Sequence, residues 1–429
     1  MNSQDEGARP RVVVIGAGFA GLQCARRLAG EPVDVLVLDR ENHHLFTPLL
    51  YQVASALLNP SDIANPVRRI FQNAGNVRVR MAEVEGVDFA GRRVALADGT
   101  SIPYDRVVVA CGSRTNWFGM DGMASAALPL KNLPDALALR NHVLACFEAA
   151  AFRDPTERAA LMRFVVVGGG PTGVEYAGAL SELIRRPVRR DFPDLDIDRA
   201  RVVLIEAGPS LLTGFPAELG DYARRELERR GVEVLLETPV VGGDEREVRL
   251  GSEARIETRT IVWTAGVRPA RLVDAMAVPK TDGGRIEVDE RLRIVGVADA
   301  FAAGDAAAAR SRGGTPLPMM APPAMQAGRH AADNVLRDLR GEPLRGFAYR
   351  DKGTMATIGR SAAVAAIGRV RLKGFPGWIL WLALHLFYLI GFRNRLAVLL
   401  EWTWDYLRWD RPIRLITRAR GDPAAPRVG

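Results

Sequence analysis

Two glycine turns are the positions at which this chain could bind nucleotides. Each follows a run of β-branched residues, Val12–Ile15 in one case and Phe164–Val167 in the other, and each leads into a helical pattern. In such a unit the first glycine makes the tight turn, the second lets the backbone approach a pyrophosphate closely, and the third lets the helix pack on the strand. Two units predict two dinucleotides and electron transfer between them. The glycines are Gly16, Gly18 and Gly21 in the first unit and Gly168, Gly170 and Gly173 in the second.

An acidic residue ends the second predicted strand of each unit. Asp39 follows the strand at 33–38, and Glu206 follows the strand at 202–205. A carboxylate here is placed to bind a ribose 2′-hydroxyl and would repel a 2′-phosphate, so Glu206 favours NAD over NADP. The glycine-to-acid spacing in the second unit is long, which we attribute to a charged insertion at 185–198. The alternative for either acid is a solvated residue at a strand end.

A Gly304–Asp305 pair follows a strand of small residues at 299–303. Asp305 can bond a ribityl hydroxyl of a flavin, and a helix predicted to begin there would face phosphate. An isolated Gly–Asp pair is usually a turn, but its position after two dinucleotide units favours the flavin.

Composition narrows the class of protein. A chain of 429 residues, 48% hydrophobic and 25% charged, predicts two or three folded domains. The net charge of +8 favours an anionic membrane surface over nucleic acid, because basic residues and aromatics are not interleaved before the C-terminal region. The polar N-terminus predicts no secretory signal. Cys24, Cys111 and Cys146 form no closely spaced pair, so we expect packing roles, and His43–His44 lacks further ligands for a metal site.

The segments around the two units carry weaker signals. Residues 42–54 are apolar without periodicity and contain Pro48, which predicts an ordered loop. The other predicted strands are at 77–79, 86–89, 93–96, 106–110, 233–236 and 260–264. The predicted helices are at 19–28, 134–151, 174–184 and 217–230, with one more helix that ends at about 339.

The C-terminal region predicts a monotopic membrane anchor on the cytoplasmic face, the alternative being a dimer or domain interface. Residues 374–392 are apolar on every side but at the short limit of about 20 residues for a spanning helix. A helix at 395–409 is amphipathic, with aromatics expected at headgroup depth and arginines expected to attract anionic lipid. The apolar face holds Leu396, Leu399, Leu400, Thr403 and Leu407, with Trp404 at its edge, and the opposite side holds Glu401, Asp405 and Arg408. The flanking aromatics are Trp402, Tyr406 and Trp409. The arginines are at 393, 395, 408, 411, 414, 418 and 420.

Over nearly its whole length the chain resembles the type II NADH dehydrogenases. The glycine units are shared by many flavoproteins, whereas Phe46–Ala54 (FTPLLYQVA) and the Trp–His–Leu tail around 381–386 make the match specific. The resemblance also rests on residues 264–269 and 304–307. It implies an α/β fold with two Rossmann-like dinucleotide-binding domains, like that of glutathione reductase, and a membrane-associating helical region. The expected bounds are 1–120 and 286–345 for the FAD domain, 121–285 for the NADH domain and 346–429 for the C-terminal region.

The resemblance implies hydride transfer from NADH to FAD and transfer of two electrons to a membrane quinone (menaquinone or ubiquinone), without proton pumping, by a homodimer. Glu175 matches an acid beside the nicotinamide–flavin stack, with a salt bridge as the alternative, and Gln326 matches a glutamine near the quinone, with a cap or packing role as the alternative. Gln52 is the third catalytic candidate. Pro322 stands where the family commonly has glutamine. The implied FAD contacts are Gly16, Gly18, Phe19, Ala20, Gly21, Asp39, Arg40, Ala110, Gly112, Gly304 and Asp305, and the NADH contacts are Gly168, Gly170, Pro171, Thr172, Gly173, Glu206, Ala265 and Gly266.

Other functions are less well supported. A sulfide:quinone oxidoreductase needs a cysteine pair at the flavin, and a ferredoxin-type reductase does not need the tryptophan-rich tail. A disulfide reductase needs a C-x-x-x-x-C motif, which is missing. A membrane redox sensor that binds NADH without turnover stays open, and flavin reduction without reoxidation by any quinone would support it.

Overall fold

The computed structural model describes residues 9–408, 411 and 413–417 and divides into two compact units. The first contains residues up to His44, 65–114 and 267–351; the second contains 45–64, 115–266 and the chain from Lys352 onward. These bounds differ from the four expected segments in three places: 45–64 lies in the second unit, 267–285 lies in the first, and the expected C-terminal region is part of the second unit.

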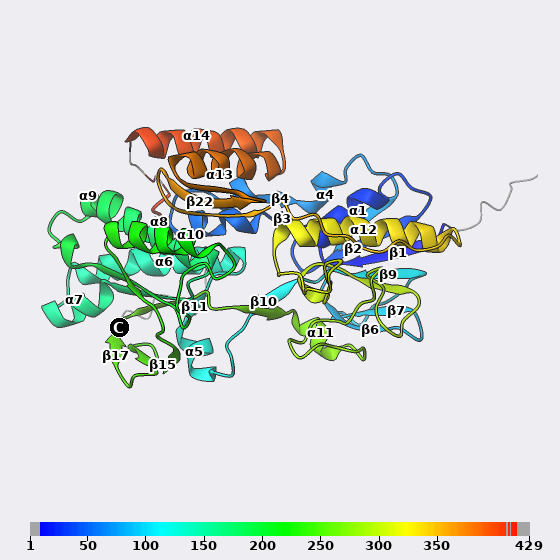
Figure 1. The fold of residues 1–429 in the computed structure, drawn as a ribbon, viewed down its shortest axis with the longest axis horizontal. Coiled ribbons are helices and arrows are strands. Elements are labelled where there is room, and N and C mark those ends of the chain that lie inside the picture. The colour runs from blue at the N-terminus through cyan, green and yellow to red at the C-terminus, as the bar shows by residue number, and fades with distance from the viewer. Residues whose placement is uncertain (1–8, 409–410, 412, 418–429) are drawn as a thin grey trace, which may run out of the picture. The chain divides into compact units, whose positions relative to one another are not determined.

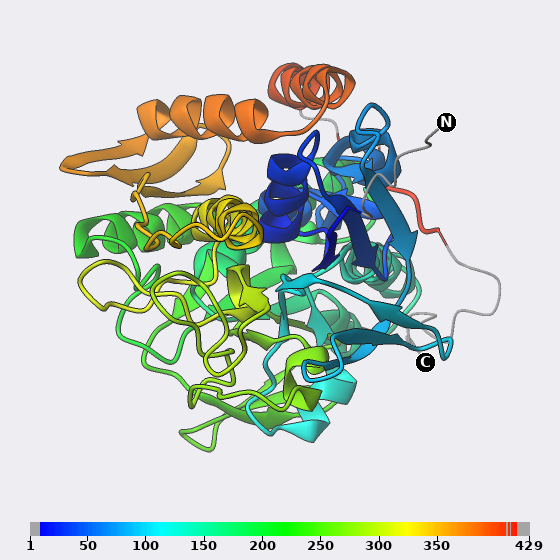
Figure 2. The same ribbon diagram turned by 90° about the vertical axis from the view of Figure 1, so that its right-hand side faces the viewer.

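The first unit is built on a five-stranded parallel sheet in the order β20-β9-β1-β2-β5. Its central strands are nearly continuous runs of buried β-branched residues, as expected of a sheet covered on both faces. Helix α1 (Phe19–Leu28) lies beside helix α12 (Ala321–Leu339), as Figure 2 shows. The strands are β1 (Arg11–Ile15), β2 (Asp34–Asp39), β5 (Val77–Met81), β9 (Arg106–Val109) and β20 (Ala300–Ala302), with a small antiparallel sheet of β6 (Val84–Asp88), β7 (Arg93–Leu96) and β8 (Ser101–Pro103).

The second unit repeats this plan with a parallel sheet in the order β11-β18-β12-β13-β14. Helix α8 (Pro171–Leu183) follows the strand β12 (Arg163–Val167), as α1 follows β1. The other strands are β11 (Leu128–Pro129), β13 (Arg201–Ile205), β14 (Val232–Leu235) and β18 (Thr260–Trp263), with β15 (Val240–Gly243), β16 (Glu247–Leu250) and β17 (Arg255–Glu257) in a separate antiparallel sheet; the helices are α5 (Asp121–Ala126), α6 (Leu133–Ala150), α7 (Pro155–Leu161) and α10 (Ala217–Arg229).

A further layer of the second unit carries the C-terminal helices. Strands β21 (Thr354–Gly359), β22 (Ala362–Ile367) and β23 (Val370–Gly374) form an antiparallel sheet that contacts α8 and α10. Helix α13 (Phe375–Tyr388) lies over this sheet, and helix α14 (Phe392–Arg408) contacts α13 and the short helix α3 (Pro60–Ile63); both lie above α8 and α10 in Figure 1. The fold therefore places the C-terminal helices near the helix that follows the second glycine turn.

Three local predictions are wrong. Residues 47–54 are not a loop but a 3-10 turn (Thr47–Leu49) and helix α2 (Leu50–Ala54), which has no polar face because every residue of α2 is buried. Residues 184–191 are not an insertion without structure: they continue α8 as a π-helical turn (Ile184–Val188), which accommodates Pro187, and a helical turn, α9 (Arg189–Asp191). Gly304–Ala306 is one 3-10 turn and not a helix start, because the backbone is extended again at Ala307.

The remaining short elements are β3 (His43–Leu45), β4 (Ala64–Pro66), β10 (Ser113–Thr115), β19 (Val267–Pro269), α3 (Pro60–Ile63), α4 (Val67–Ile70), α11 (Arg271–Ala275) and a 3-10 turn at Ile197–Arg199.

Candidate functional site

The first glycine turn forms an open cradle at the carboxyl end of β1. Gly16 has φ +103°, and a Cβ atom there would lie 2.3 Å from the carbonyl oxygen of Ala110. A Cβ atom on Gly21 would lie 1.8 Å from the carbonyl oxygen of Gly16, so helix and strand approach as closely as only glycine allows. A Cβ atom on Gly18 would meet nothing within 4 Å, so the space next to the helix N-terminus is free for a ligand.

Polar groups surround this cradle. The carboxylate of Asp39 accepts hydrogen bonds from the backbone N–H of Ala17 (2.5 Å) and of Glu41 (2.8 Å). Each carboxylate oxygen keeps acceptor capacity for a ribose hydroxyl. Burial raises the pKa of Asp39, while these backbone N–H groups and nearby Arg40 oppose the rise. Ser113 donates its hydroxyl proton to Asp305, which follows Gly304.

The expected FAD contacts of the first unit are thereby brought to one edge of its sheet. The turn residues, Phe19 and Ala20 begin α1, Ala110 and Gly112 follow β9, and Gly304 lies against Ala20. A cradle that side chains would fill, with a carboxylate at the next strand end, fits a dinucleotide.

The second glycine turn has the same construction. A Cβ atom on Gly168 (φ +110°) would lie 2.7 Å from the Cα atom of Ala265, whereas one on Gly170 would meet nothing within 4 Å. Glu206, one residue beyond β13, accepts hydrogen bonds from the backbone N–H of Gly169 (2.6 Å) and of Gly208 (2.7 Å). Pro171 and Thr172 open α8 beside Gly173, and Gly266 follows Ala265. These residues likewise fit a dinucleotide.

Glu175 lies one turn into α8 and is the most perturbed carboxyl group of this region. Its side chain is buried, and its Oε1 accepts a hydrogen bond from the backbone N–H of Thr357 at 3.2 Å. Burial raises the pKa of Glu175 from 4.5 to about 8, although the Thr357 N–H and the Trp381 indole both lower it. The carboxyl group is therefore mostly protonated at pH 7. The salt bridge that was its alternative role is not among its contacts within the described chain.

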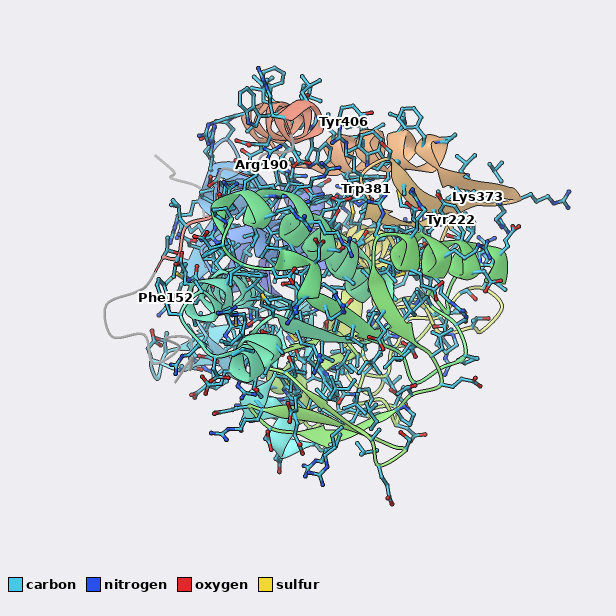
Figure 3. The ribbon with its side chains drawn as sticks, turned by 90° about the vertical axis from the view of Figure 1, so that its left-hand side faces the viewer. Phe152, Arg190, Tyr222, Lys373, Trp381 and Tyr406 are labelled. Carbon is cyan, nitrogen blue, oxygen red and sulfur yellow. The ribbon has the colours of Figure 1, made fainter. Side chains whose placement is uncertain are left out.

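An aromatic cavity, partly open to solvent, adjoins Glu175. Trp381 stacks on His385 with ring centroids 4.0 Å apart, and Trp378 stacks on Tyr406 at 5.5 Å. Figure 3 shows Trp381 on α13 and Tyr406 on α14 close together. Other residues that line the cavity are Tyr51, Gln52, Glu182, Trp402, Asp405 and Arg411.

Gln52 holds two walls of this cavity together. Its Nε2 donates to the hydroxyl of Tyr51 (2.8 Å), and its Oε1 accepts from Nε1 of Trp402 (2.8 Å). Trp402 was predicted at headgroup depth, and that prediction is wrong because the indole is buried against Gln52. The sequence showed Gln52 only through the family motif, and it gave no signal for this pairing.

Arg411 closes the cavity from the chain that follows α14. Its guanidinium donates to the carbonyl oxygens of Ser55 (3.0 Å) and Ala179 (2.9 Å) and to Glu182 (3.1 Å). The prediction that Arg411 attracts lipid is therefore wrong. Arg414 also pairs with protein, at 2.5 Å from Asp191. Trp409, Arg418 and Arg420 lie outside the described residues.

Gln326 lies in the first unit, on α12, and does not line this cavity. Both polar atoms of its amide bond the backbone of Arg350, since Nε2 donates to the carbonyl oxygen at 2.9 Å and Oε1 accepts from the N–H at 3.0 Å. This pairing favours the packing role, and the quinone contact stays a prediction.

The C-terminal helices present apolar side chains outward. On α14 the large residues of the predicted face are exposed, from 46% for Leu399 to 70% for Leu407, while Asn394, Val398 and Trp402 face the protein. Of the helices that the structure describes, none is both long and apolar enough to cross a membrane. The exposed set is Phe375, Ile379, Phe387, Phe392, Leu396, Leu399, Leu400, Trp404 and Leu407.

The three cysteines lie apart as free thiols, two of them fully buried. Burial raises the pKa of Cys24 and of Cys111 to about 12 and that of Cys146 to about 11. The thiols stay protonated, which agrees with packing roles.

Comparisons with known proteins agree with this geometry. The model of the pyridine nucleotide-disulphide oxidoreductase family matches residues 10–328. The type II NADH:quinone oxidoreductases Ndh and NdhA of Mycobacterium tuberculosis are 39% and 38% identical to this chain, over 95% and 97% of its length and 90% of theirs. NDH2 of Plasmodium falciparum, solved in complex with NADH, has the same fold, with a TM-score of 0.87 at 18% identity over 94% of this chain and 99% of its own. The chain belongs to the type II NADH:quinone oxidoreductases.

Proposed function

We propose that Glu175 supplies a proton for quinone reduction and that α13 and α14 hold this side of the protein on a membrane surface. The chain oxidises NADH and reduces a quinone without pumping protons. Its cofactor FAD, when bound, supplies the two-electron carrier between the two substrates. The protein positions these molecules and controls where protons enter.

The two cradles support an assignment of the two nucleotides. We assign FAD to the turn at Gly16–Gly21 with Asp39 on a ribose, and NADH to the turn at Gly168–Gly173 with Glu206 on the adenosine ribose. Both carboxylates are held by backbone N–H groups, so they are fixed before the nucleotide arrives. The Glu206 carboxylate would repel a 2′-phosphate, which favours NADH over NADPH.

The observation that carries the proposal is a protonated acid in an aromatic cavity. Reduction of a quinone to a hydroquinone consumes two electrons and two protons. A carboxyl group whose pKa is about 8 holds a proton at pH 7 and can release it to a quinone oxygen as charge develops there. Trp381, Trp378 and Tyr51 give the cavity apolar walls suited to a planar quinone ring.

The membrane contact follows from the outward faces of α13 and α14. Exposed leucines and phenylalanines in such number are typical of a surface that another apolar phase covers. Arg393, Arg395 and Arg408 are exposed beside them and suit anionic headgroups, which are typical of the cytoplasmic leaflet. We infer peripheral binding at the cytoplasmic face. The homodimer stays a prediction from the resemblance.

The test is an anaerobic titration of the FAD-loaded protein in detergent. We expect NADH to bleach the flavin absorbance and a soluble quinone to restore it. Glu175→Gln should still bleach but recover more slowly. Bleaching without recovery would contradict the quinone as acceptor and point to a sensor or a protein acceptor, and no bleaching with FAD intact would point to a sulfide-type donor.

A further inference from the structure

Phe118 adopts a backbone conformation that bulky residues rarely take. Its φ is +51°, and its side chain is 60% exposed. The other large apolar residues with positive φ in the described chain, Leu212 and Leu292, are buried, so packing accounts for them. An exposed aromatic residue gains no such packing. Backbone strain that is retained without a packing reason is concentrated at ligand sites.

Hydrogen bonds hold this strained turn against the end of β18. The backbone N–H of Asn116 donates to the carbonyl oxygen of Gly266 (3.1 Å), and its side-chain oxygen accepts from the N–H of Phe118 (3.0 Å). Nε1 of Trp263 donates to the carbonyl oxygen of Asn116 (2.8 Å), and the ring of Trp117 packs on Trp263 at 5.6 Å. The Phe118 ring lies beside Gly266, because a Cβ atom built on Gly266 would lie 3.1 Å from Cζ of Phe118.

The strand order of the second unit's parallel sheet indicates which half of the dinucleotide lies near Phe118. Strand β12 ends in the glycine turn for the pyrophosphate, with β13 on one side and β18 on the other. Glu206 at the end of β13 is placed for the adenosine ribose, so the nicotinamide half extends toward the end of β18. Ala265 and Gly266 follow β18, and the backbone of Ala265 lies against Gly168.

We propose that Phe118 packs against the nicotinamide ring of bound NADH and is a positioning residue for this substrate. The inference rests on the proposed NADH site. The hydrogen-bonded turn sets the backbone position of Phe118 before the nucleotide binds, and the exposed surface of the ring can be covered by the nicotinamide. The turn at 116–118 therefore presents an aromatic ring at one end of the nucleotide site.

The test compares two ligands that differ in the nicotinamide. In Phe118→Gly the glycine adopts a positive φ without strain, so the turn keeps its shape. By titration calorimetry on the oxidised, FAD-loaded protein we expect the Kd of NAD⁺ to rise about tenfold, as loss of one aromatic contact predicts. ADP-ribose, which lacks the nicotinamide ring, should bind the variant as it binds the wild type. Phe118→Tyr should bind NAD⁺ normally.

A control and three outcomes complete the design. Phe152 is 89% exposed, stands at the edge of the unit in Figure 3 and lies on the chain leading to the amino end of β12, so Phe152→Gly should bind both ligands normally. Unchanged NAD⁺ binding in Phe118→Gly would overturn the proposal. Equal losses for NAD⁺ and ADP-ribose would also overturn it, since they would show general damage to the site. A wild-type protein that binds neither ligand would refute the NADH site itself and the inference with it.

Discussion

Replacing Glu175 with glutamine should stabilise the protein while impairing its reaction. Burial raises the pKa of this carboxyl group from 4.5 to about 8. Between pH 4.5 and about pH 8 the carboxyl group is ionised in the unfolded chain and protonated in the folded one, so the folded state binds more protons. Stability then falls as pH rises, by about 1.4 kcal/mol per pH unit for one proton. Glutamine has the same shape and does not titrate.

The size of the effect follows from this slope. At pH 7 the wild type carries a free-energy penalty on the order of 3 kcal/mol that Glu175→Gln lacks, and the penalty levels off above pH 8. Below pH 4.5 the two proteins should be equally stable. The amide oxygen of glutamine can still accept the N–H of Thr357, so the hydrogen bond at 3.2 Å is kept.

Thermal midpoints of the FAD-loaded proteins, measured from pH 5 to pH 8, test this reasoning. The midpoint of Glu175→Gln should exceed that of the wild type by a margin that widens with pH, to roughly 5 °C. Glu218→Gln is the matched control, because Glu218 is an exposed acid on α10 and should show no such trend. In turnover with quinone, kcat of Glu175→Gln should fall about a hundredfold. Parallel midpoint curves for wild type and variant would refute the buried, protonated acid.

Three further predictions test the other contacts. Glu206→Arg should weaken NADH use and admit NADPH, measured as the ratio of the two KM values, and an unchanged KM for NADH would contradict the assignment. Leu400→Glu combined with Leu407→Glu should release the protein from anionic liposomes in a flotation assay without loss of flavin, whereas continued flotation would argue against the anchor. Gln52→Leu leaves the indole N–H of Trp402 without its acceptor, so the midpoint should drop by the equivalent of about 1–3 kcal/mol; an unchanged midpoint would show that the pairing contributes nothing.

The two glycine turns and their carboxylates were predictable because their signals are local. A glycine turn after a buried strand and an acid after the next strand depend on short-range backbone geometry, and in the structure Gly16 and Asp39 occupy the places that the pattern predicts. The amphipathic pattern of α14 also identified its outward leucines. Periodicity shows which residues share a face, and here the shared face is the exposed one.

The cavity could not be predicted because its walls come from distant parts of the chain. Helix α2 has no periodic pattern, since a helix buried on all sides has no polar face to reveal it. Trp402 and Arg411 belong to a segment rich in aromatic and basic residues, which is also the pattern of a membrane surface. Only the hydrogen bonds of Trp402 to Gln52 and of Arg411 to Glu182 show that these two side chains pack inside the protein.

Helix α8 connects the nucleotide turn and the cavity within one rigid element. It begins at Pro171, directly after the glycine turn, and Glu175, Ala179 and Glu182 follow at spacings that place them on one stripe along the cavity. A Cβ atom on Gly178 would lie 1.9 Å from the carbonyl oxygen of Ile358, so glycine at this position lets β21 approach closely enough for the Thr357 N–H to reach Glu175. The burial that raises the pKa of Glu175 and costs stability is therefore set by the same helix that follows the second glycine turn.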